Sequence, residues 1–342
     1  TLEAAGYEVD LIDAVGEDVM NIVPTECGRK KRQGLSPEAI LDKIDPSADL
    51  LGISLMYSLE WIEHRELIEK IHRKYPELTI IVGGEHPTAL PEYVLRNCSA
   101  IDYVVSGEGE LSFLELVHCL ITDGDTPGVP GLCYIDSDDN FVSTGLGRRI
   151  KDFQNLPRPA WHLCSVESYF GDLFAFGVSF GKNMPILATR GCPYKCTFCS
   201  NPTMWTTRYL MRDPEDVVDE IEELIEAYGC NSIDFADLTA IIKKPWILEF
   251  CKELKARDID IVWQLPTGTR SEALDHDTLS AIYDAGCRLV VYAPESGSPE
   301  TLEMIQEQFK KFTDDEIIPY ANEWHLKDAL IPDETLKKIF PQ

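Results

Sequence analysis

Three cysteines within eight residues form the group in this sequence that is best suited to chemistry. Cys192, Cys196 and Cys199 have three and two residues between them. Thiolates bind soft metals, chiefly zinc and iron in iron–sulfur clusters. Structural zinc takes four protein ligands, and no further Cys or His lies within about twenty residues on either side of the group. The spacing therefore favours an iron–sulfur cluster with one iron left open over a zinc site or a chance grouping.

The other eight of the eleven cysteines are scattered singly along the chain. Several have apolar neighbours, so we expect small buried hydrophobic side chains rather than ligands: Cys27, Cys98, Cys119, Cys133, Cys164, Cys230, Cys251 and Cys287. No basic segment followed by an apolar run opens the chain, so the sequence predicts no secretory signal. We therefore expect reduced thiols and a cytoplasmic location.

The net charge of the chain excludes several classes of partner. The 342 residues carry 59 acidic and 31 basic side chains, a formal charge of −28. Such a field repels phosphate backbones and anionic membrane surfaces, so we expect no nucleic-acid partner. No apolar run approaches the ~18 residues that a membrane span needs, so we expect no membrane partner either. A small-molecule substrate is the remaining expectation.

The elements before residue 126 alternate between strand and helix. Strands are predicted at residues 7–14, 49–55, 78–82 and 101–105, and helices at 59–75, 91–96 and 110–121, with a further helix beginning at Ser36-Pro37. This alternation predicts a doubly wound, flavodoxin-like or Rossmann-like α/β domain over residues 1–125. In the flavodoxin-like strand order, residues 7–14 would be the second strand. The first strand would then be missing, leaving an unfilled slot beside the middle of the sheet. Because the chain opens on Thr1 in a predicted helix end, we expect a partial or trimmed chain.

Two further regions follow. Residues 126–184 are predicted to hold a β-hairpin, with strands at 128–135 and 140–144, and a stiff proline-rich connector at 156–161. Residues 185–305 are predicted to hold four β/α units, with strands at 186–189, 232–235, 259–263 and 288–292 and helices at 214–228, 246–255, 277–285 and 299–305. Barrels of such units close with six or eight of them, so the sequence predicts a partial barrel. The three clustered cysteines follow its first strand, where α/β folds keep their sites.

The cysteine spacing, with Phe198 just before the last cysteine, resembles the signature of radical S-adenosylmethionine (SAM) enzymes. The resemblance implies that Cys192, Cys196 and Cys199 hold a [4Fe–4S] cluster whose fourth iron binds the amino and carboxylate groups of SAM. One electron from the cluster would then cleave SAM and give a 5′-deoxyadenosyl radical. The same resemblance implies that Phe198 packs near the adenine of SAM.

Four shorter segments resemble the branch of that family with a cobalamin-binding domain, over about residues 1–305: residues 82–87, 107–110, 213–215 and 295–298. Within it the chain is most similar to anaerobic magnesium-protoporphyrin IX monomethyl ester cyclase-like proteins. The resemblance implies that Glu295 contacts the ribose or amino group of SAM; the alternative is a carboxylate at a helix N-terminus. Asp234 and Asp237 come after the second barrel strand. We expect them either to line the opening of the SAM site or to be solvated loop carboxylates.

Cobalamin is expected over the carboxyl ends of the N-terminal strands, where glycines let a ligand approach the backbone closely. The residues expected there are Ser54, Gly83, Gly84, Glu108 and Gly109. The Asp-x-His-x-x-Gly motif that often supplies a cobalt ligand in this fold is absent from the sequence. His86 is a possible substitute, but an ordinary hydrogen-bonded loop histidine is the favoured interpretation.

The C-terminal residues 306–342 have a different character. Residues 312–324 and 331–334 resemble the first helices of acyl-CoA dehydrogenases, although an amphipathic helix of similar composition is the alternative. So short a segment holds no flavin pocket, so no dehydrogenase activity is implied.

Together these features predict a radical SAM enzyme that uses cobalamin to methylate, or oxidatively cyclise, an unknown small molecule. Its electron donor would be a flavodoxin or ferredoxin. The alternatives are a radical SAM enzyme with a non-cobalamin N-terminal domain, and a non-catalytic iron–sulfur or zinc protein. A tRNA-modifying enzyme is disfavoured by the charge of −28. Because the barrel is partial, we expect residues 1–342 alone to bind a cluster without efficient catalysis.

Overall fold

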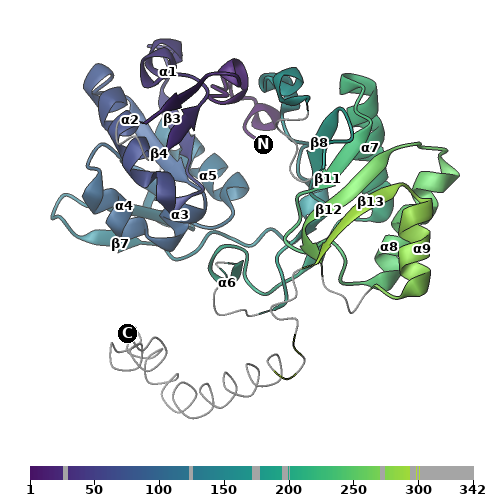
Figure 1. Cartoon of the computed structure of the whole chain (residues 1–342). Coiled ribbons are helices and arrows are strands. Elements are labelled where there is room, and N and C mark those ends of the chain that lie inside the picture. Colours follow the sequence, from purple (N-terminus) through teal and green to yellow (C-terminus); the bar gives the residue numbers. More distant parts are fainter. Residues whose placement is uncertain are drawn as a thin grey trace, which may run out of the picture. The chain divides into compact units, whose positions relative to one another are not determined.

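The computed structural model describes residues 1–25, 30–122, 126–171, 178–194, 199, 201–269, 274–292, 298 and 300. Residues Thr1–Val291 form one compact unit, and Tyr292–Gln342 form a second. Apart from residue 300, the predicted helix at 299–305 and the tail 306–342 lie outside the described residues. The first unit contains two main sheets (Figure 1).

The first main sheet has the strand order β3-β4-β5-β6-β7. The strands β3 (Leu50–Ser54), β4 (Thr79–Gly83) and β5 (Tyr103–Val105) are parallel, as the sequence predicts. The predicted hairpin is also confirmed, because β6 (Leu132–Ile135) and β7 (Phe141–Ser143) pair antiparallel. β6 in turn pairs antiparallel with β5, so the hairpin extends this sheet.

Helices cover both faces of the first sheet. They are α1 (Pro37–Lys43), α2 (Trp61–Lys74), α3 (Glu85–Ala89), α4 (Pro91–Asn97) and α5 (Gly109–Ile121). Successive side chains of a strand point to opposite faces. Accordingly Ile80 packs in one core with α2 and α4, whereas Ile81 packs in another with α5. The α/β prediction for this region is confirmed, including the side-chain cap of Ser36 on α1.

The N-terminal segment differs from the prediction. Residues 7–13 form no strand, and an unpredicted small hairpin follows, β1 (Ile22–Pro24) with β2 (Lys31–Gln33). A strand needs a neighbour to satisfy its backbone, and β3, at the end of the sheet, pairs with β4 only. The segment is held by side chains instead: the Asp13 carboxylate accepts the Gly16 N–H at 2.9 Å and the Tyr169 hydroxyl at 2.6 Å. Among the described residues β3 is therefore the edge strand of the sheet, and the predicted slot between it and a strand at residues 7–14 is not formed.

The second main sheet has the order β13-β12-β11-β8. Its strands are β8 (Asn183–Ile186), β11 (Ser232–Phe235), β12 (Val262–Thr269) and β13 (Cys287–Tyr292), and β8, β11 and β12 are parallel. Each of the four predicted barrel strands has a counterpart, but two are shifted: β8 shares only residue 186 with the predicted 186–189, and β12 shares only residues 262–263 with the predicted 259–263. The first ends three residues earlier than predicted, because Thr189 and Arg190 form a separate short strand, β9, that pairs with β10 (Leu210–Met211).

Three helices pack on one face of this sheet: α7 (Pro214–Tyr228), α8 (Lys244–Ala256) and α9 (His276–Asp284). The rings of Phe235, Phe250 and Trp263 form the centre of that core, with centroids 5.4 to 5.5 Å apart. The alternate side chains Ser232, Asp234 and Gln264 are polar, yet they are also buried. The face that would line a barrel is therefore polar.

The single cysteines pack as expected where the structure describes them. Cys98, Cys133, Cys230, Cys251 and Cys287 are buried, Cys119 and Cys164 are half-buried, and Cys27 lies outside the described residues. Burial raises the pKa of Cys251 and of Cys287 to about 12, so both stay protonated thiols near pH 7. Within the described part of the chain, no helix has the length and apolar character of a membrane span.

Candidate functional site

The carboxyl ends of the first sheet line a cavity of about 620 Å³. Strand register brings the ends together, since Ser54 pairs with Gly83 and Gly83 with Val105. All five residues expected near cobalamin line this cavity: Ser54, Gly83, Gly84, Glu108 and Gly109. Three separate segments of sequence therefore meet at one place.

Glycine is required structurally at one of these positions and leaves open space at another. Gly84 has φ +107°, and a Cβ there would lie 2.5 Å from the Leu55 carbonyl oxygen. A Cβ on Gly109 would instead meet nothing within 4 Å. Gly109 is the first residue of α5, so the start of that helix lines the cavity. A large cofactor can therefore approach the backbone here.

Glu108 lines the cavity, but its carboxylate is engaged with the protein. The side chain is 2% exposed; Oε2 accepts the Ile150 N–H at 2.6 Å, and Oε1 forms an ion pair with Arg149. Burial and the nearby Arg190 and Arg208 lower the pKa of Arg149 to about 10, so it remains charged near pH 7. Glu108 therefore acts as an anchor, in the sense that its carboxylate holds residues 149–150 in place.

Arg149 connects this anchor to the cysteine segment. Its Nη2 donates to the Arg208 carbonyl at 3.1 Å, and its guanidinium lies 5.9 Å from the Trp205 ring centre. Arg190 lies 5.4 Å from the same ring and pairs with Glu110 at 2.5 Å. Trp205 itself lines the cavity. The sequence carried no signal for the contacts of Arg149 with residue 208 and of Arg190 with Glu110, because they join residues more than forty positions apart.

The cysteine segment follows β9 directly. Gly191 has φ +83°, and a Cβ there would lie 2.3 Å from the Arg208 carbonyl oxygen. Cys192 is half-buried, and its carbonyl accepts the Asn201 side-chain amide at 3.2 Å, whereas Cys199 is exposed. Cys196 and Phe198 lie outside the described residues.

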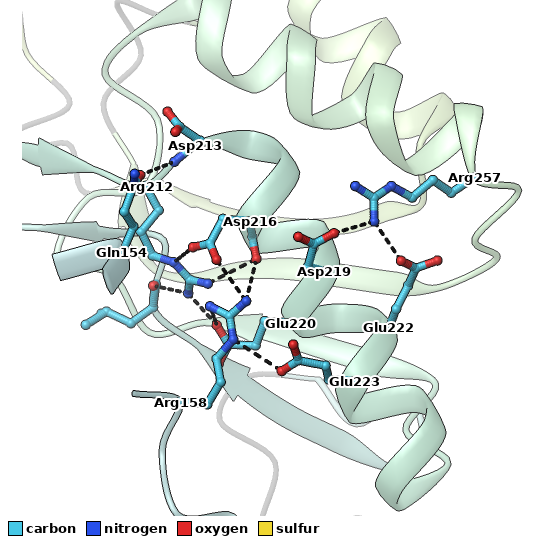
Figure 2. A network of polar contacts seen from close by, with 11 residues as sticks. Gln154, Arg158, Arg212, Asp213, Asp216, Asp219, Glu220, Glu222, Glu223 and Arg257 are labelled. Atoms are coloured by element: carbon cyan, nitrogen blue, oxygen red, sulfur yellow. Dashed lines mark hydrogen bonds and ion pairs between the residues drawn. The ribbon is translucent and has the colours of Figure 1, made fainter. Parts of the chain in front are cut away.

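A polar network fixes the chain on both sides of this segment (Figure 2). Arg212 donates to Asp216 at 2.6 Å and to the Leu187 carbonyl at 3.1 Å, and it pairs with Glu220. Arg158, in the predicted connector, pairs with Asp216 at 2.8 Å. The network therefore ties the connector and the approach to β9 to helix α7.

Asp237 follows β11 and is fully buried. One carboxylate oxygen accepts the Ala188 N–H at 3.2 Å, while the other has no hydrogen bond of regular geometry within the described part of the chain, although the Thr189 side chain lies beside the carboxyl group. Burial raises the pKa of Asp237 to about 6. Asp234, on β11, is also buried, and it accepts the Asn183 amide. Neither is a solvated loop carboxylate. Glu295 lies outside the described residues.

His86 matches the favoured interpretation of a hydrogen-bonded loop histidine. It is 3% exposed, and its Nδ1 lies 2.8 Å from the Ser58 hydroxyl. Its ring packs against Trp61 with the centroids 5.1 Å apart, and burial lowers its pKa. The residues that line the cavity do not include His86.

Comparisons with known proteins identify both halves of this arrangement. Residues 1–117 match the B12 binding domain, and residues 186–318 match the radical SAM superfamily. An uncharacterized methyltransferase of Pyrococcus horikoshii is 30% identical over 88% of this chain and 64% of its own length. The anaerobic magnesium-protoporphyrin IX monomethyl ester cyclase of Rubrivivax gelatinosus is 28% identical over 90% of this chain and 52% of its own length.

A solved structure shares the fold. OxsB, a cobalamin-dependent SAM radical enzyme with aqua-cobalamin and SAM bound, superposes with a TM-score of 0.65 at 19% identity, over 78% of this chain and 38% of that chain. The chain spans about half to two thirds of the length of the methyltransferase and the cyclase that it matches. The chain therefore carries a B12-binding domain followed by a radical SAM domain.

Proposed function

We propose that this chain binds cobalamin in the 620 Å³ cavity and a [4Fe–4S] cluster at Cys192, Cys196 and Cys199. It would act as a radical SAM enzyme that methylates or cyclises a small molecule. One observation carries the proposal: the cavity formed by the predicted cobalamin residues is also lined by Trp205, which contacts the arginines beside the cysteine segment. The relatives, which are named as a methyltransferase and a cyclase, support the same reaction classes.

When bound, the cluster supplies the electron that cleaves SAM, and cobalamin supplies a carrier for a methyl group. The chain's own residues hold and orient these groups. Gly84 and Gly109 let a cofactor lie against the backbone, and Trp161 and Trp205 give the cavity wall apolar surface. Asp237 fixes the chain just after β8 through the Ala188 amide.

The remaining expectations from the sequence belong to this proposal. Phe198 and Glu295 would contact SAM, and a flavodoxin or ferredoxin would supply the electron. A cytoplasmic location suits a cluster held by reduced thiolates. The division into residues 1–125, 126–184, 185–305 and 306–342 likewise remains a prediction.

Anaerobic reconstitution tests the cluster. We expect about four irons and four sulfides per chain from the wild type. A variant with all three motif cysteines changed to Ala should lose them, whereas Cys251→Ala, in the α8 core, should retain them. Stoichiometric iron in the triple variant would show that the ligands are misassigned.

The two alternatives are separated by different measurements. Retention of hydroxocobalamin on a desalting column distinguishes a cobalamin enzyme from one whose N-terminal domain has another role. A change in the cluster's spectrum on addition of SAM distinguishes both from a non-catalytic iron–sulfur protein.

A further inference from the structure

A group of basic side chains stands beside the cysteine segment of this acidic protein. Arg148, Lys151 and Arg208 are exposed, although the chain as a whole carries a charge of −28. We call these three residues the basic rim. None of the three pairs with a carboxylate among the ion pairs of the described residues, whereas Arg149 and Arg190 are neutralised by Glu108 and Glu110. The rim therefore keeps its positive charge towards solvent.

The basic rim adjoins the segment that would hold the cluster. Arg149, between the two rim residues 148 and 151, donates to the Arg208 carbonyl at 3.1 Å, which brings the two stretches of chain together. The position of a Cβ on Gly191 lies 2.3 Å from that carbonyl oxygen and 3.0 Å from Arg149 Nη2. Cys192 follows Gly191 directly, and Cys199 is exposed.

The basic rim is unsuited to a ligand held inside the molecule. Arg148, Lys151 and Arg208 are absent from the residues that line the 620 Å³ cavity. Their side chains are free to meet an opposite charge on another molecule, and Asp152 is the exposed acid adjoining them in sequence. Exposed charges of this kind speed the association of proteins that carry opposite charge and add less to affinity.

We propose that the basic rim is the docking surface for an acidic one-electron carrier protein that reduces the cluster. This inference rests on the proposed function, since it needs a cluster at Cys192, Cys196 and Cys199. In the step, one electron leaves the reduced carrier and converts the [4Fe–4S]²⁺ cluster to the 1+ state. No bond forms or breaks, and no proton is transferred.

The test compares two reductants of the reconstituted full-length protein. The carrier is fully reduced flavodoxin, which is acidic, and the small molecule is photoreduced deazariboflavin, which is neutral. In the triple variant Arg148→Glu, Lys151→Glu and Arg208→Glu, we expect the second-order rate with flavodoxin at low salt to fall about 10-fold or more. The rate with deazariboflavin should stay within about twofold, because a neutral reductant is not steered by charge.

Ionic strength gives a second readout. The wild-type rate with flavodoxin should fall as salt is added, and the rate of the triple variant should not. The matched control is Arg73→Glu, an exposed basic residue on α2, which should behave as the wild type does. If the triple variant loses its cluster, Arg148→Gln and Lys151→Gln, which alter exposed side chains only, should each lower the flavodoxin rate selectively.

Three results would overturn the inference. Equal flavodoxin rates for wild type and triple variant would show that the carrier docks elsewhere. Binding of a fluorescent RNA oligonucleotide to the wild type but not to the variant would assign the rim to nucleic acid. If the wild type assembles no iron or sulfide, both the proposed function and this inference are wrong. If the cluster is normal and flavodoxin reduces the wild type and the triple variant at equal rates, only this inference is wrong.

Discussion

At the scale of single residues, Asp237 combines full burial with incomplete hydrogen bonding. Burial disfavours its charged form, and hydrogen bonding to the Thr189 side chain and the Ala188 amide offsets this only in part, so its pKa lies near 6. Between about pH 4 and pH 6 the folded protein holds a proton that the unfolded chain has already released. The free energy of unfolding should therefore decrease as the pH rises through this window.

Asp237→Asn tests this directly, because the amide keeps the shape of the carboxyl group and does not ionise. Relative to the wild type, we expect its free energy of unfolding to rise by about 3 kcal/mol between pH 4 and pH 7. Urea unfolding at several pH values measures the difference. Asp284→Asn, at an exposed position of α9, is the control and should show no such trend. Parallel pH profiles for Asp237→Asn and wild type would contradict the assignment.

Glu108 and Arg149 should be strongly coupled. Glu108→Gln leaves the largely buried guanidinium without its partner, a loss that costs on the order of 3 kcal/mol in buried pairs. Arg149→Gln should cost a similar amount, because it strands the buried carboxylate. The double variant should lose clearly less than the sum, as a double-mutant cycle by urea unfolding would measure. Additive losses would mean that the pair does not act as a unit.

At the scale of elements, the loops after β4 and β5 use glycine in two different ways. Gly84→Ala places a Cβ against the Leu55 carbonyl at a positive φ, so we expect it to destabilise the fold by about 1–3 kcal/mol. Gly109→Ala meets open space, so its unfolding free energy should change by less than about 1 kcal/mol. That variant should nevertheless retain less cobalamin, because its methyl group enters the cavity. Undiminished retention would place the cofactor away from the start of α5.

The elements also show what a sequence can predict and why. Strands β4 and β11 were predictable because their local pattern of apolar residues agrees with their place in a sheet. Residues 7–14 carry a similar pattern but form no strand, since pairing depends on a neighbour that local sequence does not reveal. In the candidate site, the cysteine spacing and the glycines could be recognised because they are patterns of the local sequence. The contacts of Arg149 and Trp205 depend on the tertiary fold.

At the scale of the whole molecule, the second sheet is open over the described residues, with β8 at one edge and β13 at the other. A chain of residues 1–342 alone should therefore assemble a cluster but release 5′-deoxyadenosine in less than about one turnover, because an open sheet leaves SAM incompletely enclosed. Chromatography of the products after incubation with SAM and reductant measures this yield. Multiple turnovers would show that four β/α units suffice.

The pairs Glu108–Arg149 and Glu110–Arg190 also bear on protein engineering. A chimera that exchanges the B12-binding domain of this chain for that of a relative would separate both carboxylates from their arginines. The junction of such a chimera therefore belongs after residue 151, so that Arg149 stays with Glu108. The residue at position 190 should then be chosen to pair with the residue that replaces Glu110. In evolutionary terms, the two domains are expected to be inherited together rather than recombined as independent modules.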